Sequence, residues 1–347
     1  MRGPFATKAW IVWLLCTSIL VLYLRNPLYH IIILLSALII KQAYGHLGSA
    51  LKISFWRFAL VILVFSILFN VLLVHIGQTV LLELPDSLWL VGGPLTLEAA
   101  VSGAANALVL ITLFAVFLTF NALVPTSELV ASMPRALSNV SIVVLIAMTY
   151  VPETLAQLER VREAQAVRGH DVRGLRDWRP IVIPLLIGGL ERSMNLAETM
   201  VSRGFGETKG EQLPAAMRAL LLAGLVVLFT GWLLTFWHNT LGWVLFTTGG
   251  ALLALAYLKQ GRRSKRTRYS SEAWTGFDWM LVAVSIVPVA LVLLPFPGAN
   301  QNTLGFAAYP RLSLPPFDPL IGFSLALLAA PALLSGSPGG SYTHSNA

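Results

Sequence analysis

Long runs of apolar residues recur along almost the whole chain. They lie at about 9–24, 28–43, 55–76, 98–121, 217–238, 241–258, 277–294 and 318–334. An α-helix needs roughly 17–25 such residues to cross the hydrocarbon core of a bilayer. Inside the bilayer each backbone amide and carbonyl must find its partner within the protein, and a helix provides that partner. The runs therefore predict an all-α, polytopic membrane protein with about eight transmembrane helices.

The composition agrees with a membrane location and gives no sign of chemistry carried by the chain itself. Hydrophobic residues make up 56% of the 347 positions and charged residues only 12%, whereas soluble domains carry about 25% charged residues. The lone cysteine, Cys16, excludes a disulfide within the chain and a cysteine metal cluster. The histidines lack the spacing of metal ligands. We therefore expect no catalytic residue, no metal and no cofactor.

Basic residues are distributed unevenly among the loops between the apolar runs. Lys and Arg accumulate in loops that stay in the cytoplasm. If eight spans are threaded, the basic residues on one side are Arg2, Lys8, Lys41, Lys52, Arg57 and those of 259–268. The segment 77–97, on the other side, contains no Lys or Arg. We therefore predict a multi-pass protein of the cell membrane with both termini in the cytoplasm.

The net formal charge of +8 does not indicate a nucleic-acid partner, because the excess sits in short clusters beside apolar runs. The partner that this pattern favours is the lipid bilayer. The first two runs are separated by Asn26-Pro27. A proline resists continuation of one helix and suits the start of the next, so these runs are expected to form a helical hairpin.

The segment 122–214 lies between the fourth and fifth apolar runs, and the threading places it in the cytoplasm. It is too long for a simple connection. Two stretches in it have the spacing of amphipathic helices. Their apolar positions are Leu155, Leu158 and Val161 in 153–168, and Ile187, Leu190, Met194, Ala197 and Val201 in 187–203. We expect each helix to bury its apolar stripe and to leave a polar face for a partner.

Both predicted helices end in the same way. The two ends are Val167-Arg168-Gly169 and Ser202-Arg203-Gly204, each with a glutamate five residues before the arginine, Glu163 and Glu198. Glycine just past a helix end fits the left-handed position that closes a helix. Arginine in the last turn meets the negative end of the helix dipole, and its planar fork suits an acidic groove. Two ordinary helix terminators would show the same residues, but the repetition favours a docking function.

At these residues the chain resembles the transmembrane T subunits of energy-coupling-factor ATP-binding-cassette transporters, the EcfT/CbiQ family. That family carries an Ala-Arg-Gly type of motif at the ends of two cytoplasmic coupling helices, and here Val167 and Ser202 replace the two alanines. The stretches 125–129, 150–152 and 159–165 are also similar to the family. Thr149 stands where the family often has arginine, and the two apolar runs after about 262 are additional to the family core.

The resemblance implies a function without catalysis. Two cytosolic ATPase subunits would dimerise on ATP and separate after hydrolysis, with Arg168 and Arg203 each docked in a groove of one of them. The coupling helices would pass that motion to a separate substrate-binding membrane subunit, the S component, for uptake of a vitamin, a metal or a precursor. The sequence does not identify the substrate.

The resulting layout has N-terminal transmembrane helices, cytoplasmic coupling helices, core C-terminal transmembrane helices, a basic loop with an extra helix pair, and a disordered tail. Their respective bounds are 1–121, 122–214, 215–260, 261–334 and 335–347. We expect 277–334 to be a peripheral addition. Two alternatives stay open: a self-contained permease or channel, which would place polar residues in its spans, and a membrane-embedded enzyme, which would need a cluster of His, Asp or Glu.

Overall fold

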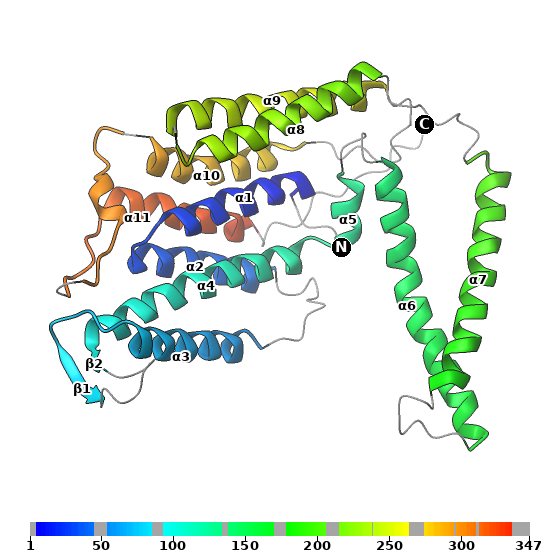
Figure 1. The fold of residues 1–347 in the computed structure, drawn as a ribbon, viewed down its shortest axis with the longest axis horizontal. Coiled ribbons are helices and arrows are strands. Elements are labelled where there is room, and N and C mark those ends of the chain that lie inside the picture. The colour runs from blue at the N-terminus through cyan, green and yellow to red at the C-terminus, as the bar shows by residue number, and fades with distance from the viewer. Residues whose placement is uncertain are drawn as a thin grey trace. The chain divides into compact units, whose positions relative to one another are not determined.

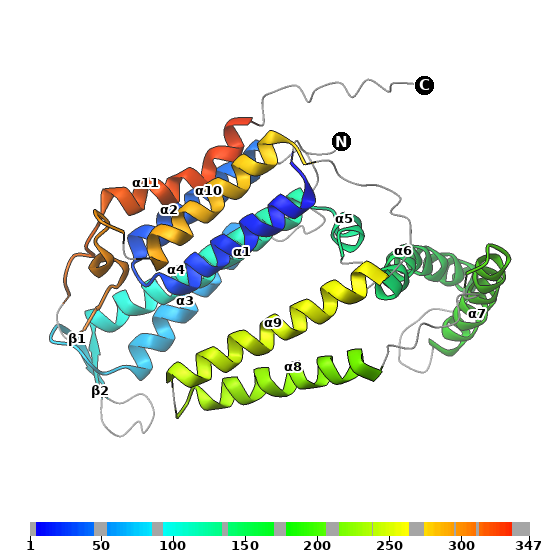
Figure 2. The same cartoon turned by 90° about the horizontal axis from the view of Figure 1, so that it is seen from above.

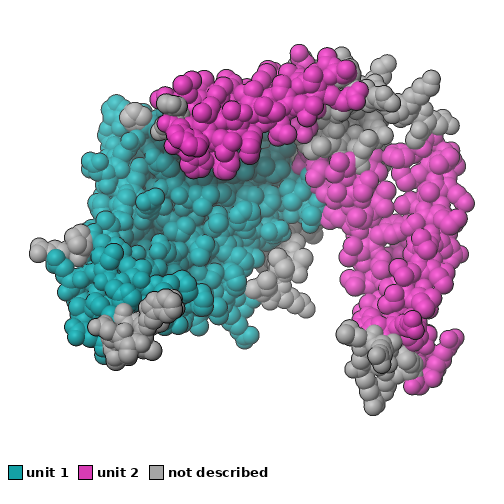
Figure 3. All heavy atoms as spheres, in the orientation of Figure 1, with its two compact units in different colours: residues 1–129, 270–347 teal, residues 130–269 magenta. Residues whose placement is uncertain are grey.

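The computed structural model is helical, with one small sheet in the part that it describes. The described residues are 5–44, 54–84, 93–133, 138–169, 178–205, 215–237, 239–263, 274–294, 296–309 and 312–334. The chain divides into two compact units (Figure 3): residues 1–129 with 270–347 form unit 1, and residues 130–269 form unit 2. An all-α membrane fold is thus confirmed, and each unit is described by itself.

Unit 1 is a helical bundle in which the first helices of the chain pack against the last ones (Figures 1 and 2): α1 lies beside α10, and α2 lies beside α11. Its helices are α1 (Thr7–Tyr23), α2 (Pro27–Ala43), α3 (Phe55–Leu73), α4 (Leu97–Leu123), α10 (Gly276–Leu293) and α11 (Pro319–Ala326), the last continued by the 3-10 helix η5 (Leu327–Leu334). A short helix, α5 (Thr126–Ala131), follows α4, and a 3-10 turn, η4 (Gln301–Leu304), precedes α11. Two antiparallel strands, β1 (Val80–Leu84) and β2 (Gly93–Thr96), join α3 to α4.

The predicted turn between the first two helices is confirmed. Asn26 caps α2 by accepting a hydrogen bond from the Leu28 amide at 3.0 Å, and Pro27 takes the first helical position. The Asn26 side-chain amide also donates to the carbonyl oxygens of Thr303 and Pro316, at 2.8 Å and 2.6 Å. The turn thus anchors the long loop before α11, and α1 packs mainly on α10 and α4 rather than on α2.

The expectation that 277–334 is peripheral is wrong. Leu281 of α10 and Ile321 of α11 are fully buried, and both belong to the same core as Trp13 of α1. The Trp13 indole N–H donates to the Leu328 carbonyl at 3.4 Å. The length of an apolar run predicts that a helix can span a membrane, but it carries no information on which helices will be its neighbours.

The predicted number of spans is not confirmed. Among the described residues, six helices are long and apolar enough to cross a membrane, namely those at 55–73, 97–123, 140–167, 215–234, 240–259 and 276–293. Shorter apolar helices occupy 7–23, 27–43 and 319–333. The helix at 140–167 meets these criteria because its first half is apolar. It lies, however, in the segment that we expected to be entirely cytoplasmic.

Unit 2 contains two helical pairs. Its helices are α6 (Ser138–Val167), α7 (Arg179–Ser202), α8 (Ala215–Leu234) and α9 (Asn239–Arg263). Glycines let α8 and α9 approach closely, since a Cβ atom at Gly231 would lie 2.4 Å from the Phe246 amide and one at Gly249 would lie 2.4 Å from the Leu228 amide. The pair formed by α6 and α7 holds the residues that the sequence marks as functional.

Candidate coupling site on two helices

The end of α6 is closed by a glycine. Gly169 adopts φ +77°, and its amide donates to the Ala166 carbonyl at 2.9 Å. The Arg168 amide donates to the Gln165 carbonyl at 3.1 Å. Only glycine takes the left-handed conformation without steric cost, so the predicted cap is confirmed at this helix end.

The end of α7 has the same closure in a more complete form. Gly204 adopts φ +75°, and its amide donates to the Val201 carbonyl at 2.8 Å. The next amide, that of Phe205, reaches back to the Met200 carbonyl at 2.9 Å. These two bonds together form a Schellman motif, which satisfies carbonyls that the last helical turn leaves without partners.

The two arginines project from these ends into open surroundings. Arg168 and Arg203 are both exposed, and Val167, beside the first of them, is 89% exposed. Within the described part of the chain, neither guanidinium forms a hydrogen bond or an ion pair. An exposed guanidinium at a helix end is available to a carboxylate of another molecule.

The residues expected to support the arginines do not contact them. Glu163 and Glu198 are exposed, and in the described residues neither carboxylate pairs with an arginine of the repeat. The Ser202 hydroxyl donates to the Thr199 carbonyl at 2.9 Å within its own helix. Their support for the arginines therefore stays a prediction, and His170, next to the first glycine, lies outside the described residues.

The two arginine tips lie at opposite ends of one antiparallel helix pair. The Gln165 side-chain amide donates to the Pro180 carbonyl at 3.4 Å, so the end of α6 meets the start of α7. Arg203 lies at the far end of α7, which has 24 residues. At about 1.5 Å per residue the two tips are separated by roughly 35 Å. Such a distance suits two separate partners rather than one shared groove.

The apolar stripe predicted on the second helix is present, but it is not buried. Its large residues are 60–66% exposed: Ile187, Leu190, Met194 and Val201. The opposite face of α7 contacts α6, with Gly188 and Arg192 at the interface. In α6, Leu155 is 56% exposed, whereas Leu158 and Val161 are half-buried. The expected burial is therefore wrong for the stripe of α7, and the fully buried residue of that helix is Ile181, which lies outside the stripe.

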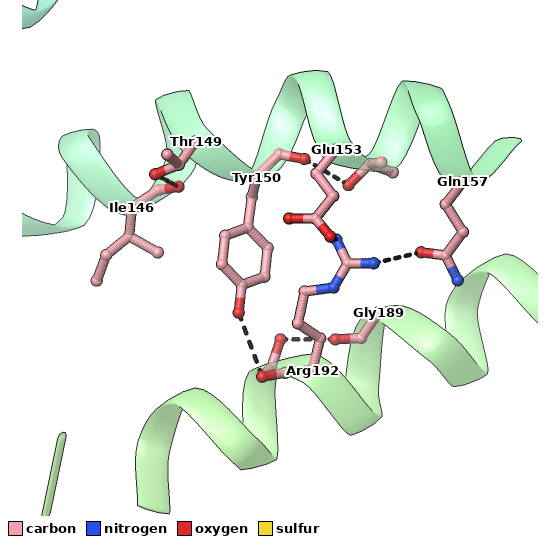
Figure 4. Close-up of polar contacts among 9 residues, drawn as sticks. Ile146, Thr149, Tyr150, Glu153, Gln157, Gly189 and Arg192 are labelled. Atoms are coloured by element: carbon pink, nitrogen blue, oxygen red, sulfur yellow. Dashed lines mark hydrogen bonds and ion pairs between the residues drawn. The ribbon is translucent and has the colours of Figure 1, made fainter. Parts of the chain in front are cut away.

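A polar cluster that the sequence did not predict joins α6 to α7 (Figure 4). Arg192 of α7 lies 3.4 Å from a Glu153 carboxylate oxygen and donates to the Gln157 side-chain oxygen at 2.9 Å. Its guanidinium also stands over the Tyr150 ring, 5.7 Å from the centroid, and the Tyr150 hydroxyl donates to the Arg192 carbonyl at 3.2 Å. We call Tyr150, Glu153, Gln157, Gly188 and Arg192 the polar crossing.

The polar crossing specifies the register of the two helices more than it stabilises them. The Glu153 side chain is 56% exposed, and a solvent-exposed ion pair is worth about 0–1 kcal/mol. The bond from Arg192 to Gln157 has a charged donor, which typically contributes about 1.5–3 kcal/mol. A Cβ atom at Gly188 would lie 2.2 Å from the Gln157 side-chain nitrogen, so a larger residue at position 188 would displace the Gln157 side chain from its bond with Arg192.

Comparison with known proteins gives one family and several relatives. The model of the cobalt transport protein family, CbiQ, matches residues 4–214, which include both arginine tips. Three relatives share the printed name energy-coupling factor transporter transmembrane protein EcfT. They come from Listeria monocytogenes (27% identical over 111 residues), Ruminiclostridium cellulolyticum (26% over 106) and Lactobacillus helveticus (30% over 108).

These alignments are partial on both sides. They cover 27%, 28% and 28% of this chain and 42%, 40% and 39% of the respective relatives. The chain thus aligns with about two fifths of the length of the curated relatives that it matches. The family match reaches from α1 to the region beyond α7, whereas α8 to α11 lie outside it.

Proposed function

Because the chain belongs to the cobalt transport protein (CbiQ) family, we propose that it is the transmembrane coupling subunit, the T component, of an energy-coupling-factor importer. It performs no hydrolysis itself and couples to ATP hydrolysis by two partner ATPase subunits. One observation carries this proposal most directly. Two exposed arginines, each presented by a glycine-capped helix end, lie at opposite ends of a single helix pair.

Each arginine tip docks in an acidic groove of one ATPase subunit. Arg168 and Arg203 are capped in the same way and exposed in the same way, so the two sites are equivalent in chemistry. A guanidinium fork can bind a carboxylate through two parallel hydrogen bonds, which fixes the direction of the helix behind it. When the ATPases approach each other on ATP binding, the two tips follow, and the angle between α6 and α7 changes.

The apolar stripe of α7 transmits that change to a substrate-binding membrane subunit. Ile187, Leu190 and Met194 lie on one helix face and are exposed. The exposed Glu191, four residues after Ile187, lies at the edge of that face. An exposed apolar stripe of this length indicates a protein interface or a membrane interface. A membrane subunit that is itself apolar fits it, and the recognition of a vitamin, a metal or a precursor is assigned to that subunit.

Copurification tests the assignment of both partners. The full chain, coexpressed with ATPase and substrate-binding membrane subunits from the same genome, should bring down both in detergent. The double variant Leu190→Ser, Met194→Ser should lose the membrane subunit and retain the ATPases, whereas Ser193→Ala, on an exposed position between them, should lose neither. Uptake by vesicles that contain the chain alone, without ATPases, would favour the alternative of a self-contained permease.

A further inference from the structure

The contacts that hold α6 against α7 are confined to one part of the pair. The hydrogen bonds and the ion pair described between the two helices fall within 150–165 of α6 and 180–192 of α7. Beyond Arg192, most residues of α7 are exposed up to the helix end. Figure 1 shows the same feature, since the two ribbons meet near the end of α6 and separate toward the end of α7.

A proline lies in α6 within the polar crossing. Pro152 has no amide hydrogen, so the helical hydrogen bond to the carbonyl four residues earlier is missing. Hydroxyls bind carbonyls on both sides of it, from Thr149 to Leu145 and from Thr154 to Tyr150, each at 2.7 Å. Prolines within helices are the usual sites of bending. The helix therefore lacks one backbone hydrogen bond close to the point where it meets Arg192.

We propose that Arg192 is the positioning residue of a pivot, a fixed crossing point about which α6 and α7 change their angle. Its guanidinium is held there by Glu153, Gln157 and the Tyr150 ring. The inference rests on the coupling function proposed above. Polar contacts concentrated at one crossing resist sliding of one helix along the other, because sliding would break several of them at once. They allow a change of crossing angle, because that motion leaves the crossing point in place and breaks only the longer bond from Gln165 to Pro180, at 3.4 Å.

The two helix segments that run from the crossing to the arginine tips, which we call the arms of the pivot, have equal length. Arg168 lies 11 residues beyond Gln157 on α6, and Arg203 lies 11 residues beyond Arg192 on α7. At about 1.5 Å per residue, each arm measures roughly 16 Å. A displacement of either tip by an ATPase subunit is thus converted into rotation about the crossing, and the stripe of α7 moves with its arm.

The distance between the tips tests the pivot without any ATPase. Spin labels on Val167→Cys and Ser202→Cys, both exposed, are introduced in a Cys16→Ser background of the full chain, and double electron–electron resonance is recorded in lipid nanodiscs. Arg192→Met should broaden the distance distribution at least about twofold and shift its mean by about 5 Å, one helical turn of sliding. Arg192→Lys, which keeps the charge but not the fork, should lie in between.

Arg162→Met is the matched control, because Arg162 is exposed on α6 and lies outside the polar crossing. It should leave the distribution unchanged. If Arg192→Met does not insert, Gln157→Leu provides the second test, because it removes the bond from the charged donor, and it should also broaden the distribution. A distribution in Arg192→Met or Gln157→Leu as narrow as that of the unaltered chain would overturn the pivot.

A second readout separates a positioning role from a merely structural one. In the assembled transporter, Arg192→Met should still bind both ATPases, since the arginine tips are intact, but uptake per ATP hydrolysed should fall about tenfold. Unchanged uptake per ATP, together with a broadened distance distribution, would also contradict the pivot. If the unaltered chain binds no ATPase, the proposed function fails, while the distance measurement still decides on the crossing itself.

Discussion

Three arginines mark the helix pair of α6 and α7: Arg168 and Arg203 lie at its two ends, and Arg192 lies where the helices cross. Arg168 and Arg203 precede glycines at the ends of helical patterns, so their placement at capped helix ends follows from local chemistry. Arg192 lies in the middle of a pattern and bonds to Gln157, 35 positions earlier in the chain. No local rule connects those two residues, because their contact depends on how α6 and α7 cross.

A glycine substitution tests the presentation of the second tip. In Gly204→Ala the left-handed cap conformation, φ +75°, becomes less favourable by about 1–2 kcal/mol. The population with a presented arginine should fall, and the apparent ATPase affinity should fall by roughly 5- to 30-fold with it. The matched control is Gly189→Ala, within α7, where a Cβ atom meets nothing within 4 Å. Equal affinities of the two variants in a titration would show that the cap is unimportant for docking.

At the scale of elements, the sequence predicted the helices well and their neighbours poorly. Each of the eight apolar runs corresponds to a helix, because apolar length is a local property. The stripe of α7 has helical spacing, yet Gly188 and Arg192, on the opposite face, contact α6. Amphipathic spacing predicts that one face of a helix is apolar and will be shielded from water. It does not predict whether the same chain, lipid or another subunit shields that face, because this depends on the tertiary structure.

The role of α10 and α11 can be tested by truncation. Removal of all residues after Arg268 exposes Trp13 and removes the carbonyl to which its indole N–H donates. It also leaves the Asn26 side-chain amide without its two acceptors in the loop before α11. Each buried polar group left without a partner costs about 1–3 kcal/mol, and in lipid these losses weigh more than the apolar contacts, which lipid chains replace. The truncated protein should therefore unfold at a clearly lower temperature in detergent. Truncation after Leu334 is the control, and identical melting of both proteins would show that unit 1 is stable without these helices.

For the whole molecule, the proposed function requires Arg168 to lie on the cytoplasmic side. That requirement is open to test, since the helix at 140–167 is apolar enough to cross a membrane. In a Cys16→Ser background, cysteines at Ser87, Val167 and Ser264 should react differently with an impermeant thiol reagent on intact cells. Because Lys and Arg retain loops in the cytoplasm, only Ser87→Cys should be labelled. Labelling of Val167→Cys from outside would mean that α6 spans the membrane and that its tip cannot meet an ATPase.

The arginine tips themselves carry the central claim. Removal of one partner of a desolvated interfacial charge pair costs about 2–5 kcal/mol, partly because the other charge is stranded. Arg168→Ala or Arg203→Ala should each weaken ATPase assembly or uncouple hydrolysis from uptake, and Lys at either position should restore only part of the loss. Membrane insertion should be unaffected, because both side chains are exposed.

The most direct measurement is therefore ATPase copurification and ATP-driven uptake by the double variant Arg168→Ala, Arg203→Ala. Its matched control is the double variant Arg160→Ala, Arg162→Ala, which removes two exposed arginines from α6 away from its end. We expect the control to assemble and transport normally, and the variant at the tips to insert normally but to lose both ATPases and uptake. If the variant at the tips binds its ATPases and drives uptake as well as the unaltered protein does, the two arginines are only parts of helix terminators, and the coupling assignment loses its structural basis.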